Sequence, residues 1–115
     1  MTRDPALEAR MAQDFADLVA AAGDLDGKPM FGGWCFLLRG HMLAAARTGR
    51  AMFRVGVAAQ DDALALPDTG PMSLAGRPKP GYVWLSEPAL SDESVRRRLA
   101  RMACAHVSDL PSKDA

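Results

Sequence analysis

Glycine-containing turns divide the middle of the chain into short apolar runs. The runs are residues 34–38, 41–47 and 51–57, and the turns before them are Gly32-Gly33, Arg39-Gly40 and Thr48-Gly49-Arg50. Runs of this length with turn residues between them are typical of antiparallel strands that follow one another along the chain. The sequence therefore predicts a three-stranded meander over residues 34–57. In its third strand, alternation should place Phe53, Val55 and Val57 on one face.

The segment after the meander predicts a short helix and two further strands. Residues 58–66 show no alternation of apolar and polar residues, and Pro67 would end a helix there. Residues 72–74 and 82–86 are the two predicted strands. Between them, residues 76–81 contain two prolines and are expected to form a rigid loop. Residues 24–29, which precede the meander, are expected to form a turn-rich connection.

A helix is predicted at each end of the chain. Asp4 is the expected N-cap of the first helix, which runs over residues 5–22 with Gly23 after its last turn. Ser91 is the expected N-cap of the last helix. The inner face of that helix should carry four spaced residues with Ala103 beside them: Val95, Leu99, Met102 and His106.

These elements predict an α+β fold with two layers. An antiparallel sheet of about five strands, the meander plus two, packs against the N- and C-terminal helices. At 115 residues with 49% hydrophobic residues, the chain fits one domain over residues 1–115. We expect its core within residues 5–110, with a flexible tail at 111–115. The aromatic core residues should be Phe15, Phe31, Phe36 and Phe53.

Charge and cysteine content favour a cytoplasmic protein. Fourteen basic and fourteen acidic residues give a formal net charge of zero, so no overall field draws the chain onto nucleic acid or an anionic membrane. Cys35 and Cys104 are too few for a disulfide framework, and we interpret them as reduced, buried thiols. We also expect no signal peptide, because no apolar segment follows the N-terminus, and no membrane span.

Four local patterns together resemble the TfoX N-terminal domain family. They are Met30-Phe31-Gly32-Gly33, then Phe36 with Gly40 and Met42, then Arg54-Val55-Gly56, and finally Gly76-Arg77-Pro78 with Gly81-Tyr82-Val83. The resemblance runs from about Met11 to Leu110. It implies a two-layer α+β fold and a role linked to transcription, because this module stands at the front of the Sxy/TfoX competence regulators. Lys79 stands where members of the family commonly carry methionine.

Most residues of these patterns are interpreted as structural. Gly32 and Gly33 could cradle an anion, but they more simply allow a turn and a close backbone approach. The same structural role is assigned to the other motif residues: Met30, Phe31, Gly40, Gly56, Gly76, Pro78 and Gly81. The two histidines and two cysteines lack zinc-ligand spacing, so we expect no metal, no cofactor and no catalytic residue.

Five residues are candidate contacts to a ligand or partner: Arg54, Arg77, Lys79, Tyr82 and Trp84. Two guanidinium groups, those of Arg54 and Arg77, could converge on one carboxylate or phosphate. Equally, they could cap backbone carbonyls or pair with Asp61 or Asp68. Tyr82 and Trp84 alternate along one strand, so they could belong to the core or to an interface. We expect one of these two rings to be partly exposed.

The basic run at residues 96–98, with Arg101, is expected to be a solvated helix face. Pairs Asp92–Arg96 and Glu93–Arg97 would support it at a spacing of four. The alternative is a contact with an acidic partner or with phosphates. Overall neutrality and the lack of neighbouring aromatics disfavour direct nucleic-acid binding.

The sequence therefore favours a non-catalytic regulatory or protein-interaction module whose protein partner is unknown. A homodimer formed by pairing of strand edges is a further possibility. The competing hypothesis is a small-molecule binding protein for an anionic ligand, or an enzyme, with Arg54, Arg77 and Tyr82 around its pocket.

Overall fold

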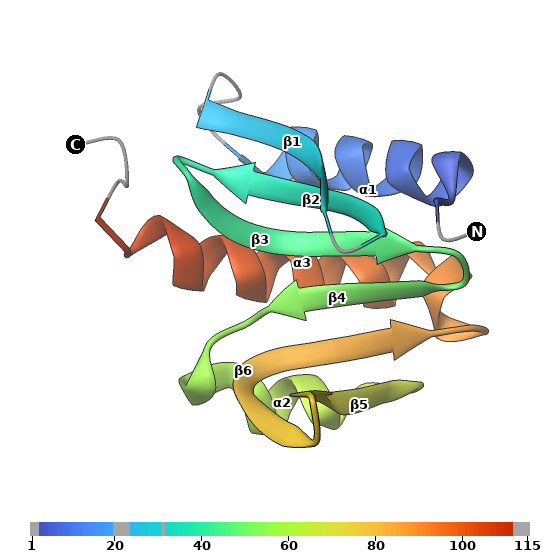
Figure 1. The fold of residues 1–115 in the computed structure, drawn as a ribbon, viewed down its shortest axis with the longest axis vertical. Helices are drawn as coiled ribbons and strands as arrows, with labels where there is room; N and C mark the ends of the chain where they lie inside the picture. The colour runs from blue at the N-terminus through green and yellow to red at the C-terminus, as the bar shows by residue number, and fades with distance from the viewer. Residues whose placement is uncertain (1–2, 20–23, 31, 112–115) are drawn as a thin grey trace.

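The computed structural model describes residues 3–19, 24–30 and 32–111. Six strands form one antiparallel sheet in the order β1-β2-β3-β4-β6-β5, and three helices accompany it (Figure 1). The strands are β1 (Leu25–Met30), β2 (Gly33–Leu38), β3 (His41–Arg47), β4 (Arg50–Arg54), β5 (Thr69–Leu74) and β6 (Arg77–Ser86). The helices are α1 (Pro5–Leu18), α2 (Gln60–Leu64) and α3 (Glu93–Ser108).

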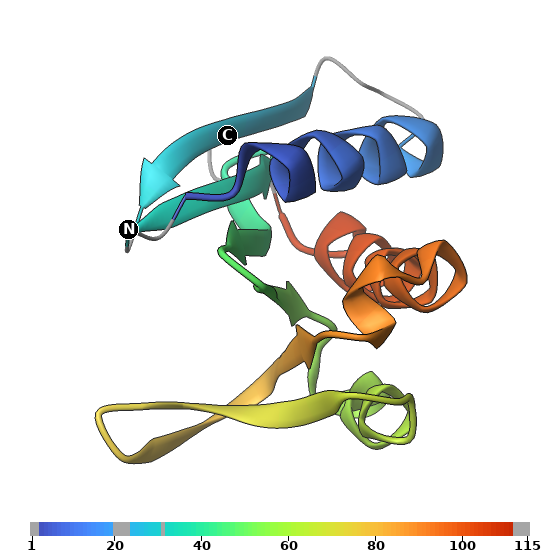
Figure 2. The ribbon, with the colours of Figure 1, turned by 90° about the vertical axis from the view of Figure 1, so that its right-hand side faces the viewer.

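The two long helices lie on one face of the sheet. Figure 2 shows α1 and α3 side by side against the middle strands, while α2 lies beside β5 and β6. The opposite face carries no helix within the described residues, and we call it the open face. The predicted α+β fold is confirmed, with six strands where about five were expected.

The core lies between the sheet and the two long helices. Phe15 on α1 packs on Phe36 of β2 with 5.4 Å between ring centroids, and Phe53 of β4 is fully buried. These three predicted core aromatics are confirmed, while Phe31 lies outside the described residues. Aliphatic side chains from the helices and central strands complete this cluster: Leu7, Leu43, Val83, Leu85, Leu99 and Val107.

The first helix begins as predicted and ends earlier. The Asp4 carboxylate accepts a hydrogen bond from the Leu7 amide at 3.2 Å, and Pro5 occupies the first helical position. The helix ends at Leu18, because Val19 already has extended backbone angles. The predicted end at residue 22 was therefore wrong, and Gly23 lies outside the described residues.

Strand β3 has the predicted bounds, but two segments predicted as loops are strands. Residues 24–29 were expected to form a connection, yet Leu25–Met30 forms the edge strand β1. Residues 76–81 were expected to form a loop, yet β6 extends back to Arg77. This outer half of β6 pairs with β5 alone, since β4 reaches only Tyr82. Prolines are tolerated in strands that lack a neighbour on one side.

The third predicted strand is shorter than expected. Strand β4 ends at Arg54, and residues 57–59 form a short 3-10 turn that leads into α2. Val55 is buried as predicted, but Val57 is 69% exposed and does not share its face. The predicted short helix is present as α2.

The last helix begins one residue later than predicted. Asp92, not Ser91, is the N-cap, because its carboxylate accepts from the Ser94 amide at 2.9 Å. Of the predicted inner-face residues, Leu99 and Ala103 are buried, whereas Val95, Met102 and His106 are only half-buried.

A buried ion pair joins the two long helices. Arg96 of α3 is 4% exposed, and its Nε donates to the Asp14 carboxylate of α1 at 2.5 Å. Arg97 donates to Asp14 at 2.9 Å and to Asp17 at 2.6 Å. The expectation of a solvated face is therefore wrong for Arg96. The predicted Asp92–Arg96 pair was also wrong, because the Asp92 side chain bonds to Ser94 instead. The predicted Glu93–Arg97 pair is present at 3.5 Å.

Candidate functional site

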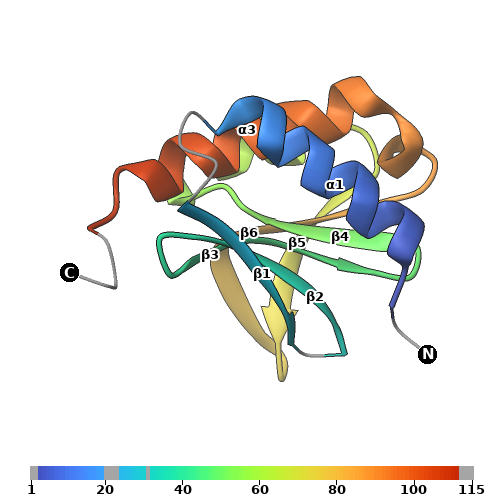
Figure 3. The same ribbon diagram turned by 90° about the horizontal axis from the view of Figure 1, so that it is seen from above.

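The sheet bends so strongly that its two ends face one another across the open face. The β1–β2 and β5–β6 hairpins both project away from the helices (Figures 2 and 3). Residues of both hairpins line a hollow of about 580 Å³ between them. We call this hollow the open-face groove. Its floor is formed by the central strands β3 and β4, which contribute Ala45 and Met52.

Methionine is the main residue type in this groove. Four of the seven methionines of the chain line it, each from a different strand: Met30, Met42, Met52 and Met72. Met52 is 4% exposed and the other three are half-buried. Methionine side chains are flexible and polarizable, so a surface rich in them adapts to differently shaped apolar partners.

Two aromatic rings extend the apolar floor along β6. Tyr82 and Trp84 lie opposite Arg54 and Met52 of β4, respectively. Side chains two residues apart on a strand point to the same face, so both rings lie on the open face beside Met52. Both are half-buried, in agreement with the expectation of partial exposure.

Cations lie over these rings. The Arg50 guanidinium is 4.4 Å from the Trp84 ring centroid, and the Lys79 ammonium is 5.5 Å from the Tyr82 centroid. Arg54 lies 5.8 Å from the same Tyr82 ring. At these distances the ring quadrupole attracts each cation, which orients the long basic side chains along the groove.

The groove is positively charged although the chain is neutral. Arg47, Arg50 and Lys79 line it, and the residues described there include no aspartate or glutamate. Within the described part of the chain, none of these three cations lies within salt-bridge distance of a carboxylate. The groove therefore combines an apolar floor with cations that have no carboxylate partner among these residues.

The structure brings some of the candidate contact residues together and separates others. Lys79, Tyr82 and Trp84 line the groove together, and Arg54 contacts Tyr82 at its margin. Arg77 pairs with Leu74 at the tip of the β5–β6 hairpin, five residues along β6 from Tyr82, which is roughly 16 Å in an extended strand. Asp68 accepts a hydrogen bond from the Ala89 amide at 2.9 Å.

The motif glycines occupy turns and close contacts. Gly32, Gly40, Gly56, Gly76 and Gly81 all have positive φ angles between 77° and 86°. A Cβ on Gly81 would lie 3.2 Å from the Gly56 backbone, and one on Gly33 would lie 2.4 Å from the Ala46 carbonyl. Gly33 and Met30 also line the groove, Pro78 pairs with Ser73 in the β5–β6 hairpin, and Phe31 lies outside the described residues.

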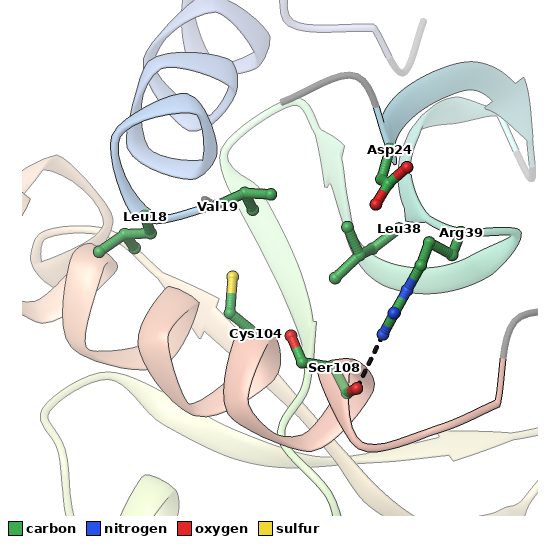
Figure 4. A pocket seen from close by; sticks show the side chains of 7 residues that line it. All are labelled: Leu18, Val19, Asp24, Leu38, Arg39, Cys104 and Ser108. Atoms are coloured by element: carbon green, nitrogen blue, oxygen red, sulfur yellow. Dashed lines mark hydrogen bonds between the residues drawn. The ribbon is translucent and has the colours of Figure 1, made fainter. Parts of the chain in front are cut away.

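A second, smaller hollow of about 320 Å³ lies between the end of α1, the β2–β3 turn and α3 (Figure 4). The Cys104 thiol points into it, and Arg39 donates to the Ser108 carbonyl at 2.7 Å beside it. Burial raises the pKa of Cys104 to about 11 and also raises that of Cys35. Both thiols are therefore protonated at neutral pH and are poor nucleophiles.

The histidines have separate surroundings. His41 hydrogen-bonds to the Pro111 carbonyl. The His106 ring lies against Gly56, where an added Cβ would approach Nδ1 to 2.5 Å. Among the described residues, no group of three or more His, Cys, Asp or Glu side chains could hold a metal ion.

The methionine lining was missed by sequence reasoning. The four residues lie on four strands that are distant in sequence, so no local motif connects them. The alternation around Phe53 was the available signal, since it placed Met52 on the face opposite the core.

Comparison with known proteins identifies the family. The sequence model of the TfoX N-terminal domain matches residues 17–107. A search of curated proteins and a search of solved structures both find no match. No helix among the described residues has the length and apolar character to cross a bilayer. Because the family model covers most of the chain, this protein belongs to the TfoX N-terminal domain family.

Proposed function

We propose that this protein is a non-catalytic regulatory module that binds a protein partner in the open-face groove. The observation that carries the proposal is the lining of that groove by four methionines and two half-buried aromatic rings. Apolar side chains gathered in a concavity of a sheet face are a common basis of protein recognition. The volume of about 580 Å³ fits a few side chains of a partner, not the whole face of a folded domain.

The regulatory part of the proposal rests on the family. The resemblance to the N-terminal module of competence regulators suggests a cytoplasmic role linked to transcription. In this proposal the module recognises a protein, and the groove, not a DNA-reading helix, makes the contact.

A small anionic ligand is the second candidate. The groove volume lies within the range of about 300–1,000 Å³ that is typical of small-molecule pockets. Its three cations would attract a carboxylate or phosphate. The apolar floor between them favours the first candidate, because a small anion leaves methionine and aromatic surface uncovered.

The experiment is site-specific photo-crosslinking in the native cell. A benzophenone amino acid replaces Met72 in the groove, and in a separate variant it replaces the exposed Arg101 on α3. We expect the Met72 position to capture a defined protein and the Arg101 position not to capture it. A product at twice the mass of the chain would identify a second copy as the partner.

The captured protein is then purified and its affinity measured with wild-type protein and with Leu74→Asp. Leu74 lines the groove and is 56% exposed, so this substitution leaves the core intact. Unchanged affinity, capture from Arg101 alone, or no capture at either position would contradict the proposal.

A further inference from the structure

The open-face groove alternates apolar surface with cations in a way that specifies its ligand. We infer that it binds an acidic amphipathic peptide segment, in which apolar side chains cover the methionine floor and carboxylates meet Arg47, Arg50 and Lys79. This inference rests on the proposed function and adds the chemistry of the partner to it.

Positive charges of the groove lie beside its aromatic rings. Arg50 lies over Trp84 and Lys79 lies over Tyr82, so a cation stands beside each of the two rings that adjoin Met52. A ligand that covers this floor therefore meets positive charge at its sides. Both cations are exposed at the groove, so a carboxylate reaches them without being fully desolvated.

The groove cations are complementary in charge to an acidic partner. The three groove cations have no carboxylate partner within the described residues. By contrast, Arg96 and Arg97 on the helical side of the molecule are held by Asp14 and Asp17. Positive potential is therefore available at the groove, and a partner with negative side chains gains from it in both affinity and association rate.

The groove lining suits a peptide better than a nucleic acid. Single-stranded nucleic acids bind through bases that stack on open aromatic faces. Here Trp84 and Tyr82 each have a cation over the ring, so less ring surface is available for a base. Methionine offers no stacking platform, but it packs well on Leu, Ile and Phe side chains. The lining therefore favours a peptide.

The test is a selection of random twelve-residue peptides displayed on phage against the immobilised full chain. Selected peptides are synthesised and titrated into protein labelled with ¹³C at the methionine methyl groups. The methyls of Met30, Met42, Met52 and Met72 report the groove. Met11 in the core and Met102 on α3 are internal controls, because neither lines it.

We expect the selected peptides to combine Asp or Glu with large apolar residues and to shift the groove methyls only. Replacing the acidic residues of a peptide by Asn or Gln should weaken binding about twofold to fivefold for each ion pair lost. Arg50→Gln and Lys79→Gln should each reproduce this loss. Arg101→Gln removes the same charge on the helical face and should leave the affinity unchanged.

The outcomes separate this inference from the proposed function. Peptides that shift the groove methyls but are neutral or basic would overturn the inference and leave the groove as a protein-binding site. If no selected peptide shifts these methyls, both fail. Tighter binding of a twelve-residue thymidine oligonucleotide at the same methyls would overturn the inference in favour of nucleic acid. Inorganic phosphate that shifts them in the millimolar range, while no acidic peptide does, would overturn it in favour of a small anion.

Discussion

Asp14 is the residue through which the two long helices are joined. It is 2% exposed, and it accepts hydrogen bonds from both Arg96 and Arg97. One guanidinium nitrogen of Arg96 donates to the Leu90 carbonyl at 3.2 Å, but the other two donate to Asp14. The buried guanidinium is therefore fully satisfied only while Asp14 is present. A buried pair of this kind costs far more to break than it contributes as a unit.

We predict that Asp14→Ala lowers the free energy of unfolding by about 3–5 kcal/mol, because it leaves the Arg96 charge buried without its partner. The measurement is urea denaturation followed by circular dichroism. Asp14→Leu combined with Arg96→Met should recover most of this loss. Asp17→Ala is the control, since its side chain is 43% exposed and should cost less than about 1 kcal/mol. A double variant no more stable than Asp14→Ala would contradict this explanation.

Gly81 is the residue that fixes the junction between β6 and the 3-10 turn after β4. Its carbonyl accepts from the Val55 and Gly56 amides, and its own amide donates to the Gln60 side chain at 2.6 Å. The φ angle of Gly81 is +86°, which strains any residue with a side chain. An added Cβ would also lie only 3.2 Å from the Gly56 backbone.

We predict that Gly81→Ala destabilises the protein by about 1–3 kcal/mol more than Gly76→Ala does, because overpacking adds to the backbone strain. Gly76 is a matched control: its φ is +79°, and nothing lies within 4 Å of an added Cβ. Thermal unfolding of both variants measures the difference. Equal losses of stability would show that the close contact at Gly81 relaxes without cost.

At the scale of elements, carboxyl groups hold the helix ends and the packing between helices. The Arg3 guanidinium lowers the pKa of Glu8, hydrogen bonds from Arg97 and then Gln13 lower that of Asp17, and bonds from Ser94 lower that of Asp92 at the start of α3. A carboxyl group with a lowered folded pKa stabilises the fold above its ordinary pKa of about 4. That contribution is lost as the pH falls through the lowered value.

We therefore predict that the free energy of unfolding is nearly constant from pH 7 to about pH 5 and falls below about pH 4. Urea denaturation at a series of pH values measures the decline. Asp17→Asn removes one of the three carboxyl groups named above whose pKa is lowered. The free energy of unfolding of this variant should therefore decline less steeply with acidification than that of the wild type. A free energy of unfolding that rises on acidification would contradict a stabilising role for these carboxyl groups.

The elements that could be predicted from sequence are those whose local pattern matches their environment. Strand β3 was predicted with its bounds because turn glycines stand on both sides of it. Strand β1 was missed because Gly27 and Pro29 indicate a turn. Glycine is needed at position 27 because the strand packs closely on the Trp34 ring: an added Cβ would lie 2.6 Å from Nε1 of Trp34. Pro29 is tolerated because β1 is an edge strand.

The residues of the groove were likewise predictable only where a local sequence pattern connects them. Tyr82 and Trp84 could be singled out because they alternate within one predicted strand. Lys79 was noted because it stands where members of the family commonly carry methionine, although it was predicted to lie in a loop. The methionines could not, because Met30 and Met72 lie on opposite edge strands of a six-stranded sheet and line one groove only through its bend. The burial of Arg96 depends on Asp14, 82 residues away, so the arginine run by itself indicated a solvated face.

At the scale of the whole molecule, the sheet separates the core from the groove. Its helical face holds the core, with ionic contacts between the helices. Its open face holds the groove, and the two hairpins that line the groove extend away from that core (Figure 2). Substitutions at exposed groove positions should therefore change binding without changing the free energy of unfolding.

The cationic groove on a chain without net charge has one further consequence. Such a molecule has no monopole field, so it does not attract polyanions at long range as a basic protein would. An anion near the groove is therefore attracted only within about a Debye length, roughly 8 Å at physiological ionic strength. For the acidic peptide inferred above, discrimination would then depend on the direction from which the ligand approaches the groove.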